Sequence, residues 1–242
     1  MSQWQESKYQ SGSKGLVASR NTAEVSVSSR IIITLVGQFY SRHIPTHIRG
    51  DLIDLGCGKS PLFGTYCQYS TCQHFLDIKN RLQHTDLNYR ASLNEPITNI
   101  TKLYDSAILS DVLEHLARPE IALASINRML KKQGVLLMTV PFLYGIHEAP
   151  HDFRRFTRFG LEYELKRAGF TRIEIHEIGG IVSAIATMML KLLSMGVGSN
   201  SWPIKLGVSL YHLLMRLPFI AWADQKSSKS YPLEYGVICY TD

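Results

Sequence analysis

The 242-residue sequence has little of what a disulfide-bonded or secreted protein needs. It holds four cysteines, Cys57, Cys67, Cys72 and Cys239, with no Cys-x-x-C pair, and these are too few for a disulfide framework. The first residues, MSQWQESKYQSGSKG, lack the apolar segment of a signal peptide. We therefore expect a reduced, cytoplasmic protein.

Charged residues are also scarce, at 19% of the chain, whereas 45% are hydrophobic, so a sizeable core can form and global disorder is excluded. Lysine and arginine number 26 against 20 aspartates and glutamates, which gives a net charge of +6. This balance permits an anionic partner but excludes a histone-like polycation. No stripe of basic and aromatic residues appears, and no nucleic acid is expected as a partner.

Segments of strand type and helix type alternate along most of the chain. Apolar residues recur at helical spacing from Ala23 to Tyr40, and short apolar runs then alternate with helical segments as far as Glu177. This alternation predicts parallel β-α-β units and an α/β fold with a doubly wound sheet. The predicted divisions are a flexible polar tail over 1–22, a core over 23–177, an apolar helical insert over 178–233 and a last strand over 234–242.

One predicted strand runs directly into a glycine turn, Asp51-Leu-Ile-Asp-Leu-Gly-Cys-Gly-Lys-Ser-Pro61. A P-loop would need glycine at position 53, where Ile53 stands inside the strand. The dinucleotide fingerprint G-x-G-x-x-G would need glycine in place of Pro61. What remains is a carboxylate, Asp54, two residues ahead of a turn that lets the backbone approach a ligand without phosphate. Such a site suits a ligand that carries a positive charge.

This turn and four later segments, in the same order, resemble the class I S-adenosylmethionine-dependent methyltransferases. The similarity extends over roughly residues 50–177. It implies a Rossmann-like, doubly wound sheet of seven strands, and the apolar segment over 178–233 would be a helical insert before the last strand. It also implies an enzyme with S-adenosylmethionine as cofactor. The matching segments are Asp54–Gly58, Phe75–Asp77, Asp111–Leu116, Leu130–Gly134 and Arg167–Phe170.

The resemblance also assigns cofactor contacts. Asp54 would organise the turn, and Asp77 would accept hydrogen bonds from both ribose hydroxyls. Near the adenine the family often has an acidic residue where this chain has Ser92, and Asp86 is the second candidate for that contact. Ser60 replaces the third glycine of the fuller family motif. The predicted cofactor-binding set is Asp54, Gly56, Cys57, Gly58, Asp77, Ser92, Leu93, Ser110 and Asp111.

The loop after the predicted fifth strand contains the densest polar cluster in the chain, His147, Glu148, His151 and Asp152. In doubly wound folds ligands bind outside the carboxyl ends of the strands, so this loop is expected beside the methyl acceptor. A hydroxyl acceptor needs a base. We predict His147 or His151 as the base, oriented by Asp152 or Glu148. The predicted catalytic residues are His147, His151 and Asp152.

Other interpretations of this loop stay open. Arg154 and Arg155 either hold an anionic acceptor or fix the loop, and in the second case Asp152 and Thr157 cap the next helix. The sequence His147-Glu-x-x-His151 imitates a zinc site, but Pro150 argues against the helix that such a site needs, so no metal is expected. Structural roles are assigned to Glu114 and His115.

The segment from Pro141 to Thr157 also resembles a branch of bacterial methyltransferases, the type 11-like branch, that often accompanies polysaccharide and glycan biosynthesis. This resemblance implies a small-molecule or glycan acceptor, methylated on a hydroxyl oxygen by in-line displacement. Two other classes are a non-catalytic interaction protein that keeps the fold and a nucleic-acid methyltransferase. For the latter, no Asn-Pro-Pro-Tyr-like tetrapeptide follows the fourth strand, where Ser110–Leu113 stand.

The predicted insert contains two long apolar stretches, 178–198 and 204–223, broken by glycines and Pro203. We expect a pair of helices folded over the acceptor pocket as a lid, or a homodimer surface. The alternative is peripheral contact of 178–223 with the inner face of the membrane, which would reach a lipid-linked glycan and leave apolar side chains such as Met195 exposed. Basic residues would then meet anionic headgroups, namely Lys191, Lys205, Arg216, Lys226 and Lys229.

Overall fold

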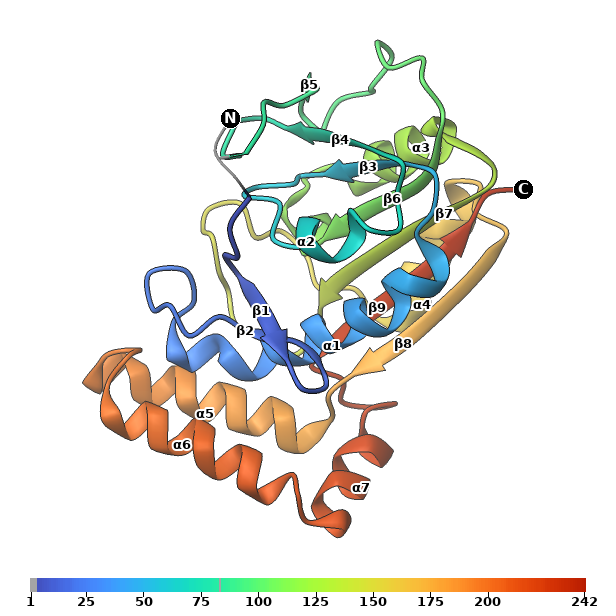
Figure 1. Ribbon diagram of the computed structural model, residues 1–242. Coiled ribbons are helices and arrows are strands. Elements are labelled where there is room, and N and C mark those ends of the chain that lie inside the picture. Colours follow the sequence, from blue (N-terminus) through green and yellow to red (C-terminus); the bar gives the residue numbers. More distant parts are fainter. Residues whose placement is uncertain (1–3, 83) are drawn as a thin grey trace.

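A computed structural model describes residues 4–82 and 84–242, and its main feature is a seven-stranded sheet (Figure 1). One strand, β9, is antiparallel to both of its neighbours, and the other pairings are parallel. The predicted α/β fold with a doubly wound, seven-stranded sheet is confirmed. In order across the sheet the strands are β5 (Tyr89–Arg90), β4 (Cys72–Asp77), β3 (Asp51–Leu55), β6 (Tyr104–Ser110), β7 (Leu130–Pro141), β9 (Glu234–Tyr240) and β8 (Arg172–Ile178).

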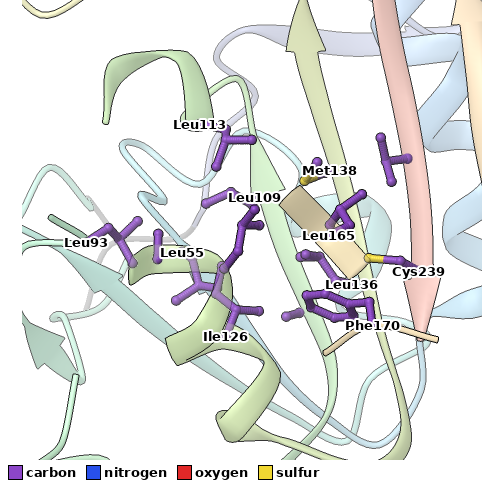
Figure 2. Close-up of a cluster of buried hydrophobic side chains, with 14 of the residues drawn as sticks. Leu55, Leu93, Leu109, Leu113, Ile126, Leu136, Met138, Leu165, Phe170 and Cys239 are labelled. Atoms are coloured by element: carbon purple, nitrogen blue, oxygen red, sulfur yellow. The ribbon is translucent and has the colours of Figure 1, made fainter. Parts of the chain in front are cut away.

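Helices cover both faces of this sheet because its strands are apolar on both sides. In β3, Ile53 and Leu55 belong to the core on one face, and Leu52 belongs to the core on the other. Figure 2 shows the first core, in which side chains of the strands meet Ile126 and Leu165 of the covering helices. These helices are α3 (Pro119–Met129) and α4 (Arg158–Arg167), while α1 (Arg30–His47) and α2 (Phe63–Tyr66) contribute to the second core.

The helix predicted from Ala23 to Tyr40 begins later and runs further than the apolar spacing indicated. The side chain of Asn21 accepts the backbone N–H of Ala23 at 3.0 Å, and a short 3₁₀ turn, η1 (Val27–Ser29), follows. Asparagine and serine side chains that bond the local backbone compete with helix formation, so α1 starts only at Arg30. Its predicted apolar face, which includes Val36, is buried.

The flexible tail predicted for residues 1–22 is wrong for the residues from 4 onward, and residues 1–3 lie outside the described part. A hairpin of β1 (Tyr9–Gly12) and β2 (Gly15–Ala18) packs on α1. The Ser41 hydroxyl of α1 accepts the backbone N–H of Leu16 at 2.6 Å, and Tyr9 is 1% exposed. The polar composition hid this hairpin because its order comes from contacts with a helix that follows later in the chain.

The insert between β8 and β9 forms three helices rather than two, namely α5 (Ile181–Val197), α6 (Trp202–Leu214) and α7 (Pro218–Ser227). Leu190 of α5 and Val208 of α6 pack with Val27 and Ile31 in a small core of their own. Figure 1 shows α5 beside α1, on the side away from the sheet, and α6 and α7 packed against α5. No single helix in residues 4–82 and 84–242 has the length and apolarity to cross a membrane. Only α6 and α7 taken together have that length and apolarity, and the two helices are bent by 95° relative to each other.

Candidate active site

A cavity of about 780 Å³ opens at the carboxyl ends of four neighbouring strands. Its wall includes Asp54 of β3, Asp77 of β4, Asp111 after β6 and Pro141 of β7. After β3 the chain continues to β4 on one side of the sheet, and after β6 it continues to β7 on the other side. A crevice therefore forms between β3 and β6, where the two connections diverge. Ligands of doubly wound folds bind at this switch in strand order. Most of the predicted cofactor and catalytic residues meet here.

The turn after β3 is shaped by residues in left-handed conformation. Gly56, Gly58 and Ser60 have φ of +62°, +54° and +54°. A side-chain carbon at Gly56 would lie 2.8 Å from Val112, whereas one at Gly58 would meet nothing within 4 Å. Glycine is therefore required at the first position by close packing, and at the second it leaves the backbone open to the cavity.

Asp54 holds this turn from beneath, as predicted. Its buried carboxylate accepts hydrogen bonds from the hydroxyls of Tyr66 at 2.8 Å and Ser60 at 3.2 Å. Burial raises the pKa of Asp54 to about 7, since the two hydrogen bonds offset the loss of hydration only in part. Cys57 is also buried in the turn, and burial raises the pKa of its thiol, so this side chain is not a nucleophile at neutral pH.

Asp77 closes the turn from the side of β4. Its carboxylate accepts the backbone N–H of Gly58 at 2.8 Å and that of Ile78 at 2.6 Å. Both Asp77 and Ile78 line the cavity, and the Ile78 side chain is 58% exposed. A carboxylate with an open apolar side chain next to it can bind hydroxyl groups and cover a flat ring.

The predicted adenine contacts need correction. Leu93 lines the cavity, but neither Ser92 nor Asp86 does in the described part of the chain. The Ser92 hydroxyl instead accepts the backbone N–H of Asn94 at 3.2 Å, and Asp86 accepts the side-chain amide of Asn80 at 3.0 Å. Asn94, which sequence analysis missed, lines the cavity beside Leu93.

Ser110 and Asp111, which were predicted to bind the cofactor, line the cavity, and Asp111 forms an ion pair that the sequence did not indicate. Its carboxylate forms an ion pair with the ammonium of Lys8 at 2.6 Å, and Lys8 precedes the N-terminal hairpin. Burial alone would raise the pKa of Asp111, but the Lys8 charge lowers it below the ordinary range. Glu234 lies in the same wall, and burial together with the Asp111 charge raises its pKa well above the ordinary value. Asp111 is thus the ionised member of this group.

Glu114 and His115, which were assigned structural roles, lie in the cavity wall together with His147. They come from a 3₁₀ turn after β6, η2 (Leu113–His115). The Nε2 atoms of His115 and His147 each lie 3.6 Å from one carboxylate oxygen of Glu114. Glu114 is 0% exposed, and neither of its carboxylate oxygens has a hydrogen-bond partner among the residues described. Burial raises the pKa of Glu114. This cluster could not be recognised in the sequence because it joins two loops 32 residues apart.

His147 is held by Asp152, one of the two predicted orienting partners. The Asp152 carboxylate accepts the backbone N–H of His147 at 2.9 Å and lies 3.3 Å from its Nδ1. The carbonyl oxygen of Gly145 also lies 3.3 Å from Nδ1. Since both neighbours of Nδ1 can only accept, Nδ1 carries a proton and Nε2 is the free nitrogen. Burial would lower the pKa of His147, but Glu114 and Asp152 raise it above the ordinary value.

Arg154 and Arg155 fix the loop and do not face an acceptor. Arg155 forms a two-fold contact with Asp152, at 2.5 and 2.8 Å, and the pKa of Asp152 is lowered chiefly by this arginine. Arg154 donates to the carbonyl oxygens of Leu116 at 2.8 Å and Ala117 at 2.9 Å. Binding of an anionic acceptor by these arginines is therefore not supported.

The remaining polar residues of this loop divide between the cavity and the next helix. His151 and Glu148 line the cavity, and His151 is exposed. The backbone carbonyl of His151 accepts a hydrogen bond from Nδ1 of His115 at 2.9 Å. Thr157 caps α4 as predicted, because its hydroxyl accepts the N–H of Gly160 at 3.1 Å. Asp152 does not cap this helix.

The predicted lid is also corrected. Among the described residues that line the cavity, none belongs to α5, α6 or α7. Its outer wall is built by the N-terminal segment, with Ser7, Lys8 and Glu24, and by α1. The insert reaches the cavity wall through Lys191, whose ammonium donates to the Ser29 hydroxyl at 2.7 Å and lies 5.6 Å from the centre of the Tyr144 ring.

Comparison with known proteins agrees with this geometry. A family model described as a methyltransferase domain matches residues 33–175, which is more than half of the chain. A search of curated proteins finds no match. Three solved structures described as S-adenosylmethionine-dependent methyltransferases are similar. The one from Archaeoglobus fulgidus has a TM-score of 0.56 at 18% identity, over 86% of this chain and 93% of that one.

The other two are from Mesorhizobium loti and Clostridium acetobutylicum. The first has a TM-score of 0.52 at 14% identity, over 85% of this chain and 99% of that one. The second has a TM-score of 0.52 at 10% identity, over 90% and 93%. At these identities the structures establish a shared fold, and the family model establishes the kinship.

Proposed function

Because the chain belongs to the methyltransferase-domain family, we propose that it methylates a hydroxyl oxygen of a small-molecule or glycan acceptor, with His147 as general base. The chain is an S-adenosylmethionine-dependent methyltransferase, and S-adenosylmethionine is its cofactor. The observation that carries the finer proposal is the position of His147, which lines the cavity, has Asp152 3.3 Å from Nδ1 and has Glu114 3.6 Å from Nε2.

The described residues suit this cofactor. The open backbone at Gly58 leaves room for the methionine part, and Asp77 offers a carboxylate to the ribose hydroxyls. Ile78 and Leu93 provide apolar contacts for the adenine ring. When bound, the cofactor supplies an electrophilic methyl group on a sulfonium. A volume of about 780 Å³ lies in the upper part of the roughly 300–1,000 Å³ range of small-molecule sites, which leaves space for an acceptor.

His147 has the arrangement of a general base. Asp152 and Gly145 fix the ring through Nδ1, so Nε2 is available to take the hydroxyl proton as the acceptor oxygen attacks the methyl carbon. The imidazolium that forms would have the Glu114 carboxylate 3.6 Å from Nε2 and Asp152 3.3 Å from Nδ1. Two carboxylates beside it stabilise the charged form, which makes the histidine a stronger base.

The choice of acceptor rests on the resemblance of the segment from Pro141 to Thr157 to methyltransferases of glycan biosynthesis. A screen should follow the labelled methyl group from S-adenosylmethionine to nucleotide sugars and lipid-linked glycans, with amine and thiol compounds and nucleic acids as comparison panels. Label on an oxygen of a sugar supports the proposal. Label found only on nitrogen, sulfur or nucleic acid would refute it.

Once an acceptor is found, His147→Gln tests the base. The variant should keep its affinity for S-adenosylmethionine and lose turnover by about 10²–10⁴-fold. The rate of the parent enzyme should rise with pH and level off only above the ordinary pKa of histidine, because the pKa of His147 is raised. The variant should lack this rise of the rate with pH. His151→Gln is the matched control. If it loses turnover while His147→Gln does not, His151 is the base.

A second candidate mechanism is metal-assisted methyl transfer, favoured by the unpartnered carboxylate of Glu114. One ligand atom each from Glu114, His115 and His147 lies within 4.8 Å of the others. A separation of 3.6 Å between carboxylate oxygen and Nε2 is close to the roughly 3.4 Å expected for two tetrahedral ligands with bonds of about 2.1 Å. A cation there would activate the hydroxyl directly, and His147 would be its ligand. Turnover lost with a chelator and restored by a divalent metal would select this mechanism; unchanged turnover would exclude it.

A further inference from the structure

The insert presents a large apolar surface to solvent. On α5, Met189, Leu192 and Met195 are 51%, 63% and 85% exposed. On α6 and α7, Trp202, Phe219 and Trp222 are 74%, 74% and 52% exposed. We call this the α5–α7 surface. Soluble monomers rarely expose apolar patches of this extent unless the patch binds a partner.

The helices that carry this surface are firmly attached to the rest of the protein. Leu190, Ile204 and Tyr211 are buried on their inner side, against Val27 and Ile31. A buried hydrogen-bond network adds to this packing, in which the Ser183 hydroxyl donates to Asp224 at 2.7 Å and lies 2.9 Å from the Tyr211 hydroxyl. The exposed apolar side chains therefore lie on the opposite side of well-packed helices and are not the product of a missing core.

The exposed charged side chains of the segment that carries the α5–α7 surface have one sign. Residues 181–231 contain five lysines and arginines and a single acid, Asp224. That acid is buried and bonded to Ser183, whereas four of the basic residues are exposed. The Lys226 ammonium lies 4.8 Å from the centre of the Trp222 ring. The exposed basic residues are Lys205, Arg216, Lys226 and Lys229.

We propose that the α5–α7 surface binds one face of an anionic lipid bilayer. Its methionine, leucine and aromatic side chains would enter the boundary between headgroups and acyl chains, and its basic residues would contact anionic headgroups. No single helix of the described chain is long and apolar enough to span, and α6 and α7 are bent by 95°, so the helices lie in the plane of the membrane. Given the proposed function, this contact would bring the enzyme to lipid-linked acceptors.

A second copy of the chain fits this surface less well. In a two-fold dimer each patch faces its own counterpart, so Lys205, Arg216, Lys226 and Lys229 of both chains would share one interface. No exposed acid in residues 181–231 would balance them. An anionic bilayer supplies the missing negative charge and an apolar interior at once.

Flotation with lipid vesicles tests the proposal with the whole chain and without any need for an acceptor. The protein should float with vesicles that contain phosphatidylglycerol and phosphatidylcholine, and only weakly with phosphatidylcholine alone. Binding should fall at high salt but not vanish, because salt screens the basic residues and leaves the apolar contacts. No binding to anionic vesicles at low salt would overturn the proposal.

Two sets of variants locate the surface. The triple variant Met195→Glu/Trp202→Glu/Phe219→Glu should abolish flotation, whereas Phe159→Glu on α4, at a side chain 79% exposed, should not. The double variant Lys205→Gln/Arg216→Gln should weaken binding roughly 25-fold, at about fivefold for each charge, and the matched Lys14→Gln/Lys132→Gln should leave it unchanged.

Light scattering decides between a bilayer and a second copy, and a thermal melt shows that each variant is folded. The proposal expects the parent protein to bind vesicles whatever its oligomeric state. Suppose that the parent protein is a dimer, that the triple substitution converts it to a monomer, and that the variants do not change vesicle binding. The α5–α7 surface then binds a second copy of the chain and not a bilayer.

Discussion

The ion pair between Lys8 and Asp111 gives the sharpest test of how the N-terminal segment is held on the cavity wall. The two side chains are 31% and 20% exposed, and their charged atoms are 2.6 Å apart. Asp111 also accepts the hydroxyl of Thr139, so the carboxylate stays in place when Lys8 is changed. Lys8→Met removes the charge and keeps most of the aliphatic chain.

The magnitude follows from the intermediate exposure of the pair. An exposed pair contributes about 0–1 kcal/mol, and loss of one partner from a fully buried pair costs about 3–5 kcal/mol. For side chains that are a fifth to a third exposed, we expect Lys8→Met to lower the free energy of unfolding by about 1–3 kcal/mol.

Urea denaturation of the parent, Lys8→Met, Asp111→Asn and the double variant measures the coupling at neutral pH. The coupling should be largest above about pH 4 and fade as pH falls, because the folded-state pKa of Asp111 is lowered and this stabilisation is lost on protonation. Lys14→Met, at an exposed lysine in the hairpin turn, is the control and should change stability by less than about 0.5 kcal/mol. If the losses of unfolding free energy in the two single variants add up to the loss in the double variant within about 0.5 kcal/mol, Lys8 and Asp111 are not coupled and the prediction is wrong.

Three further predictions concern the turn and its two acids. Gly56→Ala should destabilise the fold more than Gly58→Ala, measured by thermal unfolding, because only the first new side chain meets Val112, at 2.8 Å; equal losses would contradict this. Asp77→Ala should weaken binding of S-adenosylmethionine in calorimetry, since charge-assisted hydrogen bonds contribute roughly 1.5–3 kcal/mol each, and unchanged affinity would remove Asp77 from the site. Asp54→Asn should flatten the pH dependence of stability between about pH 4 and 7: burial raises the folded-state pKa of Asp54 to about 7, so the parent loses stability as pH rises through this window. A variant as pH-dependent as the parent would show that Asp54 titrates normally.

The fold and the cofactor side of the cavity follow closely from local sequence. Strands buried on both faces appear as short apolar runs, and the turn after β3 is marked by Gly56 and Gly58, whose φ values are positive. Asp54 and Asp77 both line the cavity because each stands near the end of a strand, and the ends of parallel strands meet at one edge of the sheet. These are signals of short range along the chain.

The opposite side of the cavity was predicted less well. Glu114 was assigned a structural role, yet its carboxylate lies 3.6 Å from Nε2 of His147, which belongs to another loop. Ser92 was favoured by its place in a family motif, but its hydroxyl bonds the local backbone at Asn94 instead. In both cases the direction of a side chain depends on contacts that the local pattern does not contain.

The sequence by itself therefore determined the alternation of strands and helices, the glycine turn and the acids at the strand ends, since each depends on neighbours a few residues away. Only the tertiary structure decided which segment closes the cavity. The polar segment before α1 is ordered by Ser41 of α1 and by Asp111, which is 103 residues from its partner Lys8. The apolar insert packs its inner side on Val27 and Ile31 and leaves its outer side exposed, while the described cavity wall includes Ser7, Lys8 and Glu24 and no residue of α5, α6 or α7.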